Sequence, residues 1–379
     1  MDFIELHKKY KQNSLFGRYI TLQDIEPILN KSSSDVVGKS VLGKPLYKYI
    51  IGSGKIKVLM WSQMHGNEST TTKALFDFLN LLYSAEQIGQ HLLKEFTFCI
   101  LPMVNPDGAE IYTRENANKV DLNRDSIALS QPESKMLRKV FDEFKPDFCF
   151  NLHDQRTIFG VGTTGLPATV SFLAPSYNEQ REVNEVRGKA MHVIVAMNKE
   201  LQKYIPNQVS LFDDGFNPNC IGDQFTLLGV PTILFEAGHY ANDYYREYTR
   251  KMIFIALISG LQNIYEIDIV DDKNASYFKI IKNNIIFYDF LYKNVKINYD
   301  GKEIITNFAA QYKEELVDGK LYFNAYIAEI GDLKGKLGHY QINAHKMLYE
   351  DDGDNYPKIN QKADFSLGKV IKFVNGSKK

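Results

Sequence analysis

The feature that most constrains the fold is an alternation between apolar runs of strand length and segments with helical periodicity. Strands that alternate with helices predict a sheet covered by helices on both faces. The predicted strands span residues 55–64, 96–104, 147–152 and 230–235, and the predicted helices span residues 68–84, 132–144, 178–204 and 243–265. We therefore predict an α/β fold with a mixed, largely parallel central sheet flanked by helices. Residues 1–30 are predicted to form an amphipathic helix followed by a loop.

The sequence pattern changes after about Asp271. Downstream of it, short alternating runs are separated by Gly, Asn and Asp, which predicts β-hairpins, with Asp300-Gly301 and Asp318-Gly319 as turn signals. The chain has 379 residues, which is more than a single hydrophobic core usually holds. We predict two domains, an α/β domain over residues 1–271 and a smaller β-rich domain over residues 272–379.

Composition argues against several classes of protein. Lys and Arg number 45 and Asp and Glu number 46, a net charge of −1 that is untypical of nucleic-acid-coating proteins and polybasic membrane binders. The apolar runs are too short to span a membrane. Cys99, Cys149 and Cys220 are far apart and favour buried free thiols in a reducing compartment. The first residues lack the apolar segment of a signal peptide, so we expect a cytoplasmic protein whose oligomeric state stays open.

A His-x-x-Glu pair follows the first predicted strand. His65 and Glu68 lie at a strand-to-helix turn, where an imidazole and a carboxylate can point at one place. These are two of the three protein ligands that a catalytic zinc ion needs. Alone, the spacing also arises by chance, and Glu68 equally suits the first turn of a helix, because the helix dipole favours a carboxylate there.

Two more polar residues lie where apolar runs end. His153 follows the third predicted strand and Glu236 follows the fourth. Functional groups of open α/β sheets collect at the carboxyl ends of the strands, which favours a ligand role for His153 over a histidine bonded to the backbone. Glu236 suits a general base beside a metal. A salt bridge to an arginine, or a helix N-cap, is the structural alternative for Glu236.

The loop after the second predicted strand is rich in hydrogen-bond donors. It contains Asn105-Pro106-Asp107-Gly108, then Arg114, then Asp121-Leu122-Asn123-Arg124. Two arginines and an asparagine can bind a carboxylate and stabilise an oxyanion. Surface arginines in a turn-rich loop would explain Arg114 alone but not the whole set.

Taken in order, these segments resemble the zinc metallocarboxypeptidases of the carboxypeptidase A type over roughly residues 40–265. The segments are His65 with Glu68, Asn105–Gly108, Arg114, Asp121–Arg124, His153 and Glu236. The resemblance implies a zinc carboxypeptidase-like catalytic domain over residues 1–271. It does not reach the β-rich domain of residues 272–379, which becomes an accessory domain.

The resemblance also implies roles at the metal. His65, Glu68 and His153 would hold Zn²⁺, with water as the fourth ligand. Glu236 would take a proton from that water and pass it to the leaving amine. The substrate would be a peptide or an N-acyl amino acid with a free carboxylate.

The donor-rich loop receives its roles from the same resemblance. Arg114 would polarise the scissile carbonyl and stabilise the oxyanion. Asn123 and Arg124 would hold the terminal carboxylate of the substrate. Asp154, directly after His153, would either support that ligand from behind or cap a helix.

The chain departs from the family at the substrate cap. These peptidases usually carry a tyrosine on a mobile loop some twenty residues before the catalytic glutamate, and residues 210–218 contain none. Tyr240 and Tyr244 follow Glu236 instead. Asp213 and Asp214 in this loop either attract a basic side chain or form a solvated turn, and we favour the turn.

The most favoured function is zinc-dependent removal of C-terminal residues from peptides. The same sequence motifs also resemble the succinylglutamate desuccinylase/aspartoacylase family, which cleaves N-acyl amino acids and carries a C-terminal β-rich domain. Asn105–Gly108 and the long helical segment before Glu236 favour the peptidase.

A catalytically inactive binding protein is less favoured, because all ligands, the base and both arginines are present. Gly52-Ser53-Gly54 precedes a strand instead of following one, which excludes a phosphate-binding loop there.

Overall fold

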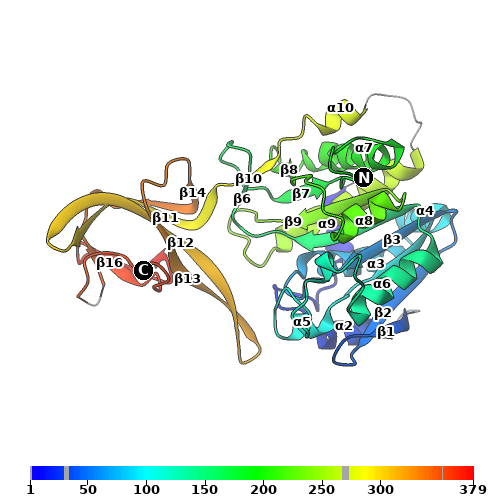
Figure 1. The fold of residues 1–379 in the computed structure, drawn as a ribbon, viewed down its shortest axis with the longest axis horizontal. Helices are drawn as coiled ribbons and strands as arrows, with labels where there is room; N and C mark the ends of the chain where they lie inside the picture. The colour runs from blue at the N-terminus through cyan, green and yellow to red at the C-terminus, as the bar shows by residue number, and fades with distance from the viewer. Residues whose placement is uncertain (1, 30–33, 267–272, 352) are drawn as a thin grey trace. The chain divides into compact units, whose positions relative to one another are not determined.

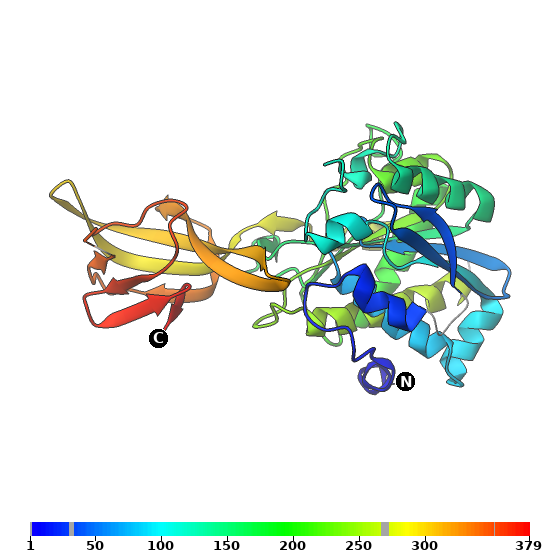
Figure 2. The same cartoon turned by 90° about the horizontal axis from the view of Figure 1, so that it is seen from below.

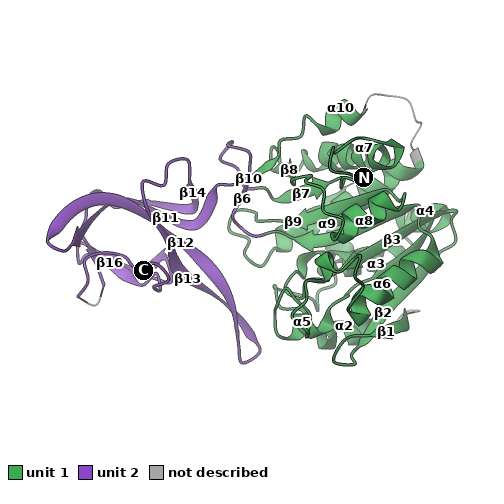
Figure 3. Cartoon of the chain, viewed as in Figure 1, with its two compact units in different colours: residues 1–155, 168–283 green, residues 156–167, 284–379 purple. Residues whose placement is uncertain are grey.

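A computed structural model describes residues 2–29, 34–266, 273–351 and 353–379. The chain forms two compact units (Figure 3). The first unit comprises residues 1–155 and 168–283, and the second comprises residues 156–167 and 284–379. The predicted boundary at residue 271 lies outside the described residues. The first unit extends to Asn283 because α10 (Lys273–Tyr277) packs against α7 (Glu185–Leu201).

An eight-stranded mixed sheet forms the centre of the first unit (Figure 1). Its strand order is β1-β2-β4-β3-β5-β9-β7-β8. The strands are β1 (Ser34–Lys39), β2 (Pro45–Gly52), β3 (Ile56–Ser62), β4 (Phe96–Leu101), β5 (Phe148–Asp154), β7 (Val170–Leu173), β8 (Val209–Leu211) and β9 (Thr232–Ala237). Strands β4, β3, β5 and β9 are mutually parallel, whereas β2 and β7 pair antiparallel with their neighbours β4 and β9. The predicted α/β fold with a mixed, largely parallel sheet is confirmed.

Helices cover both faces of this sheet, as alternation along β3 requires. Val58 and Met60 join the core formed with α3, α7 and α9, whereas Leu59 and Trp61 face α6 and α8. Besides α7 and α10, the described helices are α1 (Phe3–Tyr10), α2 (Leu22–Leu29), α3 (Thr70–Leu82), α4 (Gln87–Glu95), α5 (Pro106–Glu110), η1 (Leu122–Arg124), α6 (Pro132–Phe144), α8 (Ile221–Leu227) and α9 (Glu247–Glu266). Among the described helices, none is long and apolar enough to cross a bilayer.

Elements at the edge of the first unit differ from the prediction. In the N-terminal part, the described residues 2–29 contain two helices, α1 and α2, instead of the predicted single helix and loop. The predicted helix at residues 178–204 begins only at Glu185, because the side chain of Asn184 caps it by accepting a hydrogen bond from Arg187 N.

Cys99 and Cys149 are buried and free, and Cys220 is free and partly buried. Burial raises the pKa of the Cys99 thiol to about 12, so this thiol stays protonated at neutral pH.

The second unit is built from β-hairpins. One sheet has the order β13-β12-β11-β14 and a smaller one has the order β15-β16-β17-β18. The strands are β6 (Phe159–Val161), β10 (Asn283–Ile285), β11 (Phe287–Tyr299), β12 (Lys302–Val317), β13 (Lys320–Gly331), β14 (Leu337–Asn343), β15 (Tyr349–Glu350), β16 (Phe365–Leu367), β17 (Ile371–Val374) and β18 (Ser377–Lys378). Its core is aromatic, with Tyr292 in ring contact with Phe308 and Phe365.

Both turn signals in this part of the sequence mark hairpins. Asp300-Gly301 joins β11 to β12, and Asp318-Gly319 joins β12 to β13. All four residues have positive φ angles between 48° and 78°, the backbone conformation of the two-residue turns that match strand twist. Residues 156–167 join this unit from far upstream, because the carbonyl of Ile158 accepts hydrogen bonds from Ile286 N and Phe287 N. The sequence pattern did not indicate that residues 156–167 belong to the second unit.

Candidate metal centre

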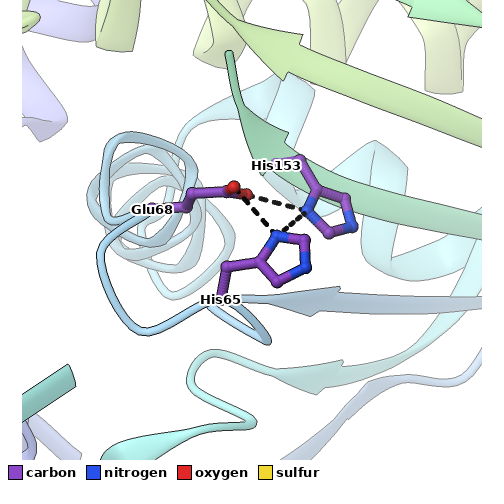
Figure 4. A group of neighbouring side chains, drawn as sticks. All are labelled: His65, Glu68 and His153. Atoms are coloured by element: carbon purple, nitrogen blue, oxygen red, sulfur yellow. Dashed lines mark hydrogen bonds and ion pairs between the residues drawn. The ribbon is translucent and has the colours of Figure 1, made fainter. Parts of the chain in front are cut away.

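The structure brings His65, Glu68 and His153 together (Figure 4). Each offers one ligand atom, and these atoms lie within 4.8 Å of one another. The arrangement follows from the sheet, because β3 and β5 are adjacent and parallel and therefore end at the same edge. His65 and Glu68 lie on the loop from β3 to α3, and His153 lies within β5 near its end.

A close backbone approach shapes the loop that carries His65 and Glu68. A Cβ atom at Gly66 would lie only 2.0 Å from the main-chain carbonyl carbon of Gly108 on α5. No residue other than glycine fits there without a backbone shift. Gln63 has a left-handed φ of 50°, and its side chain donates to the carbonyl of Gly66 at 2.9 Å. These contacts fix the turn that points both ligands at β5.

The donor atoms are arranged for a cation. His65 Nε2 lies 2.9 Å from Asp121 Oδ1, so we place the proton of the neutral ring on Nε2. The Nδ1 atom of His65 then carries a lone pair, and it faces Glu68 Oε1 at 2.8 Å and His153 Nδ1 at 3.1 Å. Zinc–nitrogen bonds measure about 2.0–2.1 Å, so two nitrogens at this separation can share one ion. The chemistry of the donor set therefore fits zinc.

The charges in the centre favour an ionised glutamate. Burial raises the pKa of Glu68, but the neighbouring His65 and His153 outweigh burial and hold this pKa well below its usual range. Burial lowers the pKa of His65, but the carboxylates of Glu68 and Asp121 raise it above its ordinary value. Burial lowers the pKa of His153. A carboxylate beside an unprotonated imidazole is the form in which these groups bind a metal.

Asp121 joins the centre, although the sequence pattern indicated no role for it. Its Oδ1 accepts from His65 Nε2, and its Oδ2 accepts from Arg114 Nε at 3.0 Å and Nη2 at 2.9 Å. It also caps η1 by accepting from Asn123 N at 2.9 Å. The Asp121 carboxylate thus orients the side chains of His65 and Arg114. It also holds the turn that carries Asn123. Its only sequence signal was its place in the Asp121–Arg124 motif.

Replacing Asp121 with asparagine should weaken metal binding without unfolding the chain. The amide cannot accept from both His65 and Arg114 as a carboxylate does, so the imidazole loses its fixed orientation. Loss of such an outer hydrogen bond typically costs about 10- to 100-fold in metal affinity. Competition with a zinc chelator measures the change. Glu110→Gln, at an exposed carboxylate that pairs with Lys44, is the matched control. Equal zinc affinity in Asp121→Asn and Glu110→Gln would contradict this role.

Glu236 lies on the strand next to His153. The two residues are register partners in the parallel pair β5–β9, so their side chains share one face of the sheet. Burial and the negative charges of Glu68 and Asp154 raise the pKa of Glu236 well above its usual range, and Arg114 and Arg246 oppose the rise. A divalent cation on the three donors would lower this pKa, because an opposite charge favours the ionised form. Glu236 therefore lies on the same sheet face as His153, with a pKa that a bound cation would lower.

Arg114 lies beside the three candidate metal donors. Its Nη1 is 3.4 Å from Glu68 Oε1, and its side chain is 44% exposed, which leaves a face open to a substrate. Asn123 Oδ1 accepts from Ile221 N at 3.1 Å, so its amide is held against the start of α8. Arg124 donates to the carbonyl of Asn123 at 2.8 Å and is exposed. The structure links Asn123 and Arg124 to the metal ligands through Asp121 and does not place them in direct contact.

Asp154 takes the capping role, and it supports Glu68 instead of the preceding His153. Its Oδ2 accepts from Thr70 N at 3.0 Å and Thr70 Oγ1 at 2.5 Å, which caps the first turn of α3. Its main-chain N–H donates to Glu68 Oε2 at 3.1 Å, which supports a ligand directly.

The loop that would carry the substrate-capping tyrosine is pinned by ion pairs. Asp214 accepts from Arg187 Nη2 at 2.8 Å and Lys282 Nζ at 2.9 Å. Burial raises the pKa of Asp214, but these two cations outweigh burial and hold this pKa down to about 2. The predicted solvated turn is therefore wrong for Asp214, which is buried and paired with basic side chains. Asp213 is exposed, and its Oδ1 lies 3.6 Å from Arg181 Nη1. Downstream, Tyr240 stacks on the ring of Tyr248.

Comparison with known families supports the resemblance stated above. Residues 30–139 match the family model described as zinc carboxypeptidase. The matched segment includes His65, Glu68, Arg114, Asn123 and Arg124 and ends before His153 and Glu236. The predicted resemblance to zinc carboxypeptidases is confirmed.

Curated relatives match parts of the chain. Carboxypeptidase 2 of Trichophyton tonsurans is 28% identical over 116 residues, 31% of this chain and 20% of the relative. Carboxypeptidase SOL1 of Arabidopsis thaliana is 26% identical over 223 residues, 51% of this chain and 45% of the relative. Gamma-D-glutamyl-L-diamino acid endopeptidase 1 of Lysinibacillus sphaericus is 30% identical over 112 residues, 27% of this chain and 28% of the relative. The matches thus span between a fifth and a half of these relatives.

Solved structures share the fold. A metallo-carboxypeptidase from Burkholderia cenocepacia aligns with a TM-score of 0.53 at 19% identity, covering 65% of this chain and 70% of the other. The carboxypeptidase A from Helicoverpa armigera aligns with a TM-score of 0.53 at 16% identity, covering 69% and 79%. At these identities the likeness concerns the arrangement of strands and helices.

Proposed function

We propose that this chain, which matches the zinc carboxypeptidase family, hydrolyses the amide bond next to a free carboxylate and thereby removes C-terminal residues from peptides. The observation that carries the proposal is the convergence of His65, Glu68 and His153, with Glu236 in register on the adjacent strand. When bound there, zinc supplies Lewis-acid activation of water and of the carbonyl.

The protein's own residues divide the remaining work. Glu236 accepts the proton of the attacking water and returns it to the leaving amine, since its carboxyl lies beside the centre and has a raised pKa. Arg114 stabilises the negative charge that develops on the carbonyl oxygen. Asn123 and Arg124 bind the terminal carboxylate and so place the last amide bond over the metal.

Replacing Arg124 with alanine should mainly raise KM for substrates with a free carboxylate. A hydrogen bond to a charged group contributes about 1.5–3 kcal/mol, so we expect KM to rise about 10- to 100-fold with a smaller change in kcat. Steady-state kinetics on one peptide series measure both constants. Arg138→Ala, at an arginine paired with Asp142 on α6, is the control. An unchanged KM in Arg124→Ala would show that the carboxylate binds elsewhere.

A second candidate function is removal of an acyl group from an N-acyl amino acid. The pinned loop at Asp214, which lacks the capping tyrosine, favours a smaller substrate than a peptide. The scissile bond is again an amide next to a free carboxylate, so the same centre serves. A panel of peptides and N-acyl amino acids separates the two functions. Turnover confined to N-acyl amino acids would overturn the carboxypeptidase proposal.

A further inference from the structure

The segment between α1 and α2 contacts the loop that carries His65 and Glu68. Residues Gln12–Ile20, here called the N-terminal strap, have irregular backbone, and Figure 2 shows this part of the chain in dark blue on the first unit. The strap's main-chain carbonyls accept hydrogen bonds from side chains of the core. The strap lies before residue 30, where the match to the family model begins.

One end of the strap is bound to the helices behind the metal loop. The fully buried Arg250 of α9 donates to the carbonyls of Gln12 at 2.9 Å and Leu15 at 2.6 Å. The fully buried Lys73 of α3 donates to the carbonyl of Gly17 at 2.6 Å. Arg250 also forms a bidentate ion pair with Asp77 of α3 at 2.5 and 2.7 Å. The strap is thereby fixed to both helices.

The other end of the strap contacts the loop that carries His65 and Glu68. Ser69, the residue after Glu68, donates its hydroxyl to the carbonyl of Arg18 at 2.5 Å. Gln63 donates to the carbonyl of Ile20 at 2.8 Å with the same amide that holds Gly66. Both donors are buried. The strap therefore supports the ligand loop on both sides of its ligands.

Arg18 touches both ligand-bearing segments. Its main-chain carbonyl binds Ser69, next to Glu68, and its guanidinium Nη2 lies 3.9 Å from Asp154 Oδ2, next to His153. The Arg18 side chain is 6% exposed, so this ion pair is shielded from water and salt. Asp154 in turn supports Glu68 through its main-chain N–H. One residue thus connects the segment of Glu68 with the segment of His153.

We propose that Arg18 is a positioning residue for the metal centre and that the N-terminal strap is a working part of that centre. A ligand set held at its binding separation loses less freedom when the ion arrives, so its affinity for the ion is higher. Arg18 sets this separation because it is hydrogen-bonded to one segment and ion-paired with the other. The inference rests on the proposed function, in that it takes zinc as the ion.

The test compares zinc affinity in strap variants of the full chain, with zinc alone as the probe. We expect Arg18→Ala to bind zinc about 10- to 100-fold more weakly in chelator competition. Arg18→Lys keeps the charge and should recover part of the affinity. Tyr19→Phe is the control, because it removes a strap contact to the carbonyl of Glu110 that does not involve either ligand segment. Melting of the metal-free forms is measured in parallel.

The outcomes are distinct. A merely structural role would lower the melting temperature of metal-free Arg18→Ala and leave its zinc affinity at the wild-type value, which overturns the inference. If Arg18→Ala does not fold, Ser69→Ala decides, because it removes only the hydroxyl donor to the strap. Wild-type zinc affinity in Ser69→Ala overturns the inference, and weakened affinity supports it. A wild-type chain that binds no zinc overturns the proposed function itself.

Discussion

Glu236→Gln should abolish turnover and leave the metal in place. Glutamine has nearly the same shape but cannot accept a proton, and a positioned general base contributes about 10²–10⁴-fold to the rate. We expect kcat to fall by roughly that factor. Zinc affinity should stay at the wild-type value, because Glu236 is outside the group of metal donors.

Single-turnover kinetics and zinc content, measured on the same preparation, check this prediction together. Glu182→Gln is a suitable control, because Glu182 is an exposed carboxylate that accepts hydrogen bonds from Asn178 and Tyr177. Activity that survives in Glu236→Gln would refute the assigned base. Zinc lost together with activity would instead make Glu236 a ligand.

His153→Ala should remove tight zinc binding. The variant lacks one of three converging donors, so the loss should exceed the about 10- to 100-fold typical of an outer hydrogen bond. His345→Ala, at an exposed histidine of the second unit, controls for loss of an imidazole as such. Zinc content after dialysis, with the melting temperature of the metal-free proteins as a fold check, measures the effect. Wild-type zinc content in His153→Ala would remove His153 from the centre.

Zinc affinity of the wild-type chain should also fall as the pH is lowered. A proton on His65 competes with the ion, and the raised pKa of His65 makes this competition begin at a higher pH than for an ordinary histidine. The pKa of Glu68 is held well below its usual range, so Glu68 stays ionised over this interval. Zinc titrations at several pH values measure the dependence, and a flat profile through the titration of histidine would contradict it.

The grouping of His65, Glu68 and His153 could be predicted from sequence because a local rule places each of them. His65 and Glu68 flank a turn between a strand and a helix, and His153 and Glu236 end apolar runs. Neighbouring parallel strands end at one edge, so predicting the strands was nearly enough to predict the site. The hairpin turns at Asp300 and Asp318 were predictable for the same reason, since two residues determine the turn.

The parts that sequence did not predict depend on long-range paths of the chain. Asp121 meets His65 across 56 positions, and nothing local distinguishes its carboxylate from that of Asp125. The N-terminal strap acts through main-chain carbonyls, which every residue has and which therefore give no compositional signal. The hairpin of β1 and β2 is only partly buried, so its apolar alternation is weak.

The central claim is that a zinc ion held by His65, Glu68 and His153 serves to cleave the amide next to a free carboxylate. The most direct measurement is mass spectrometry of one peptide incubated with the zinc-loaded chain, once with a free C-terminus and once with an amidated one. The account predicts that the free peptide loses its last residue, that the amidated peptide stays intact, and that a chelator stops the reaction. Cleavage of both peptides alike, or cleavage that a chelator leaves unchanged, would contradict it.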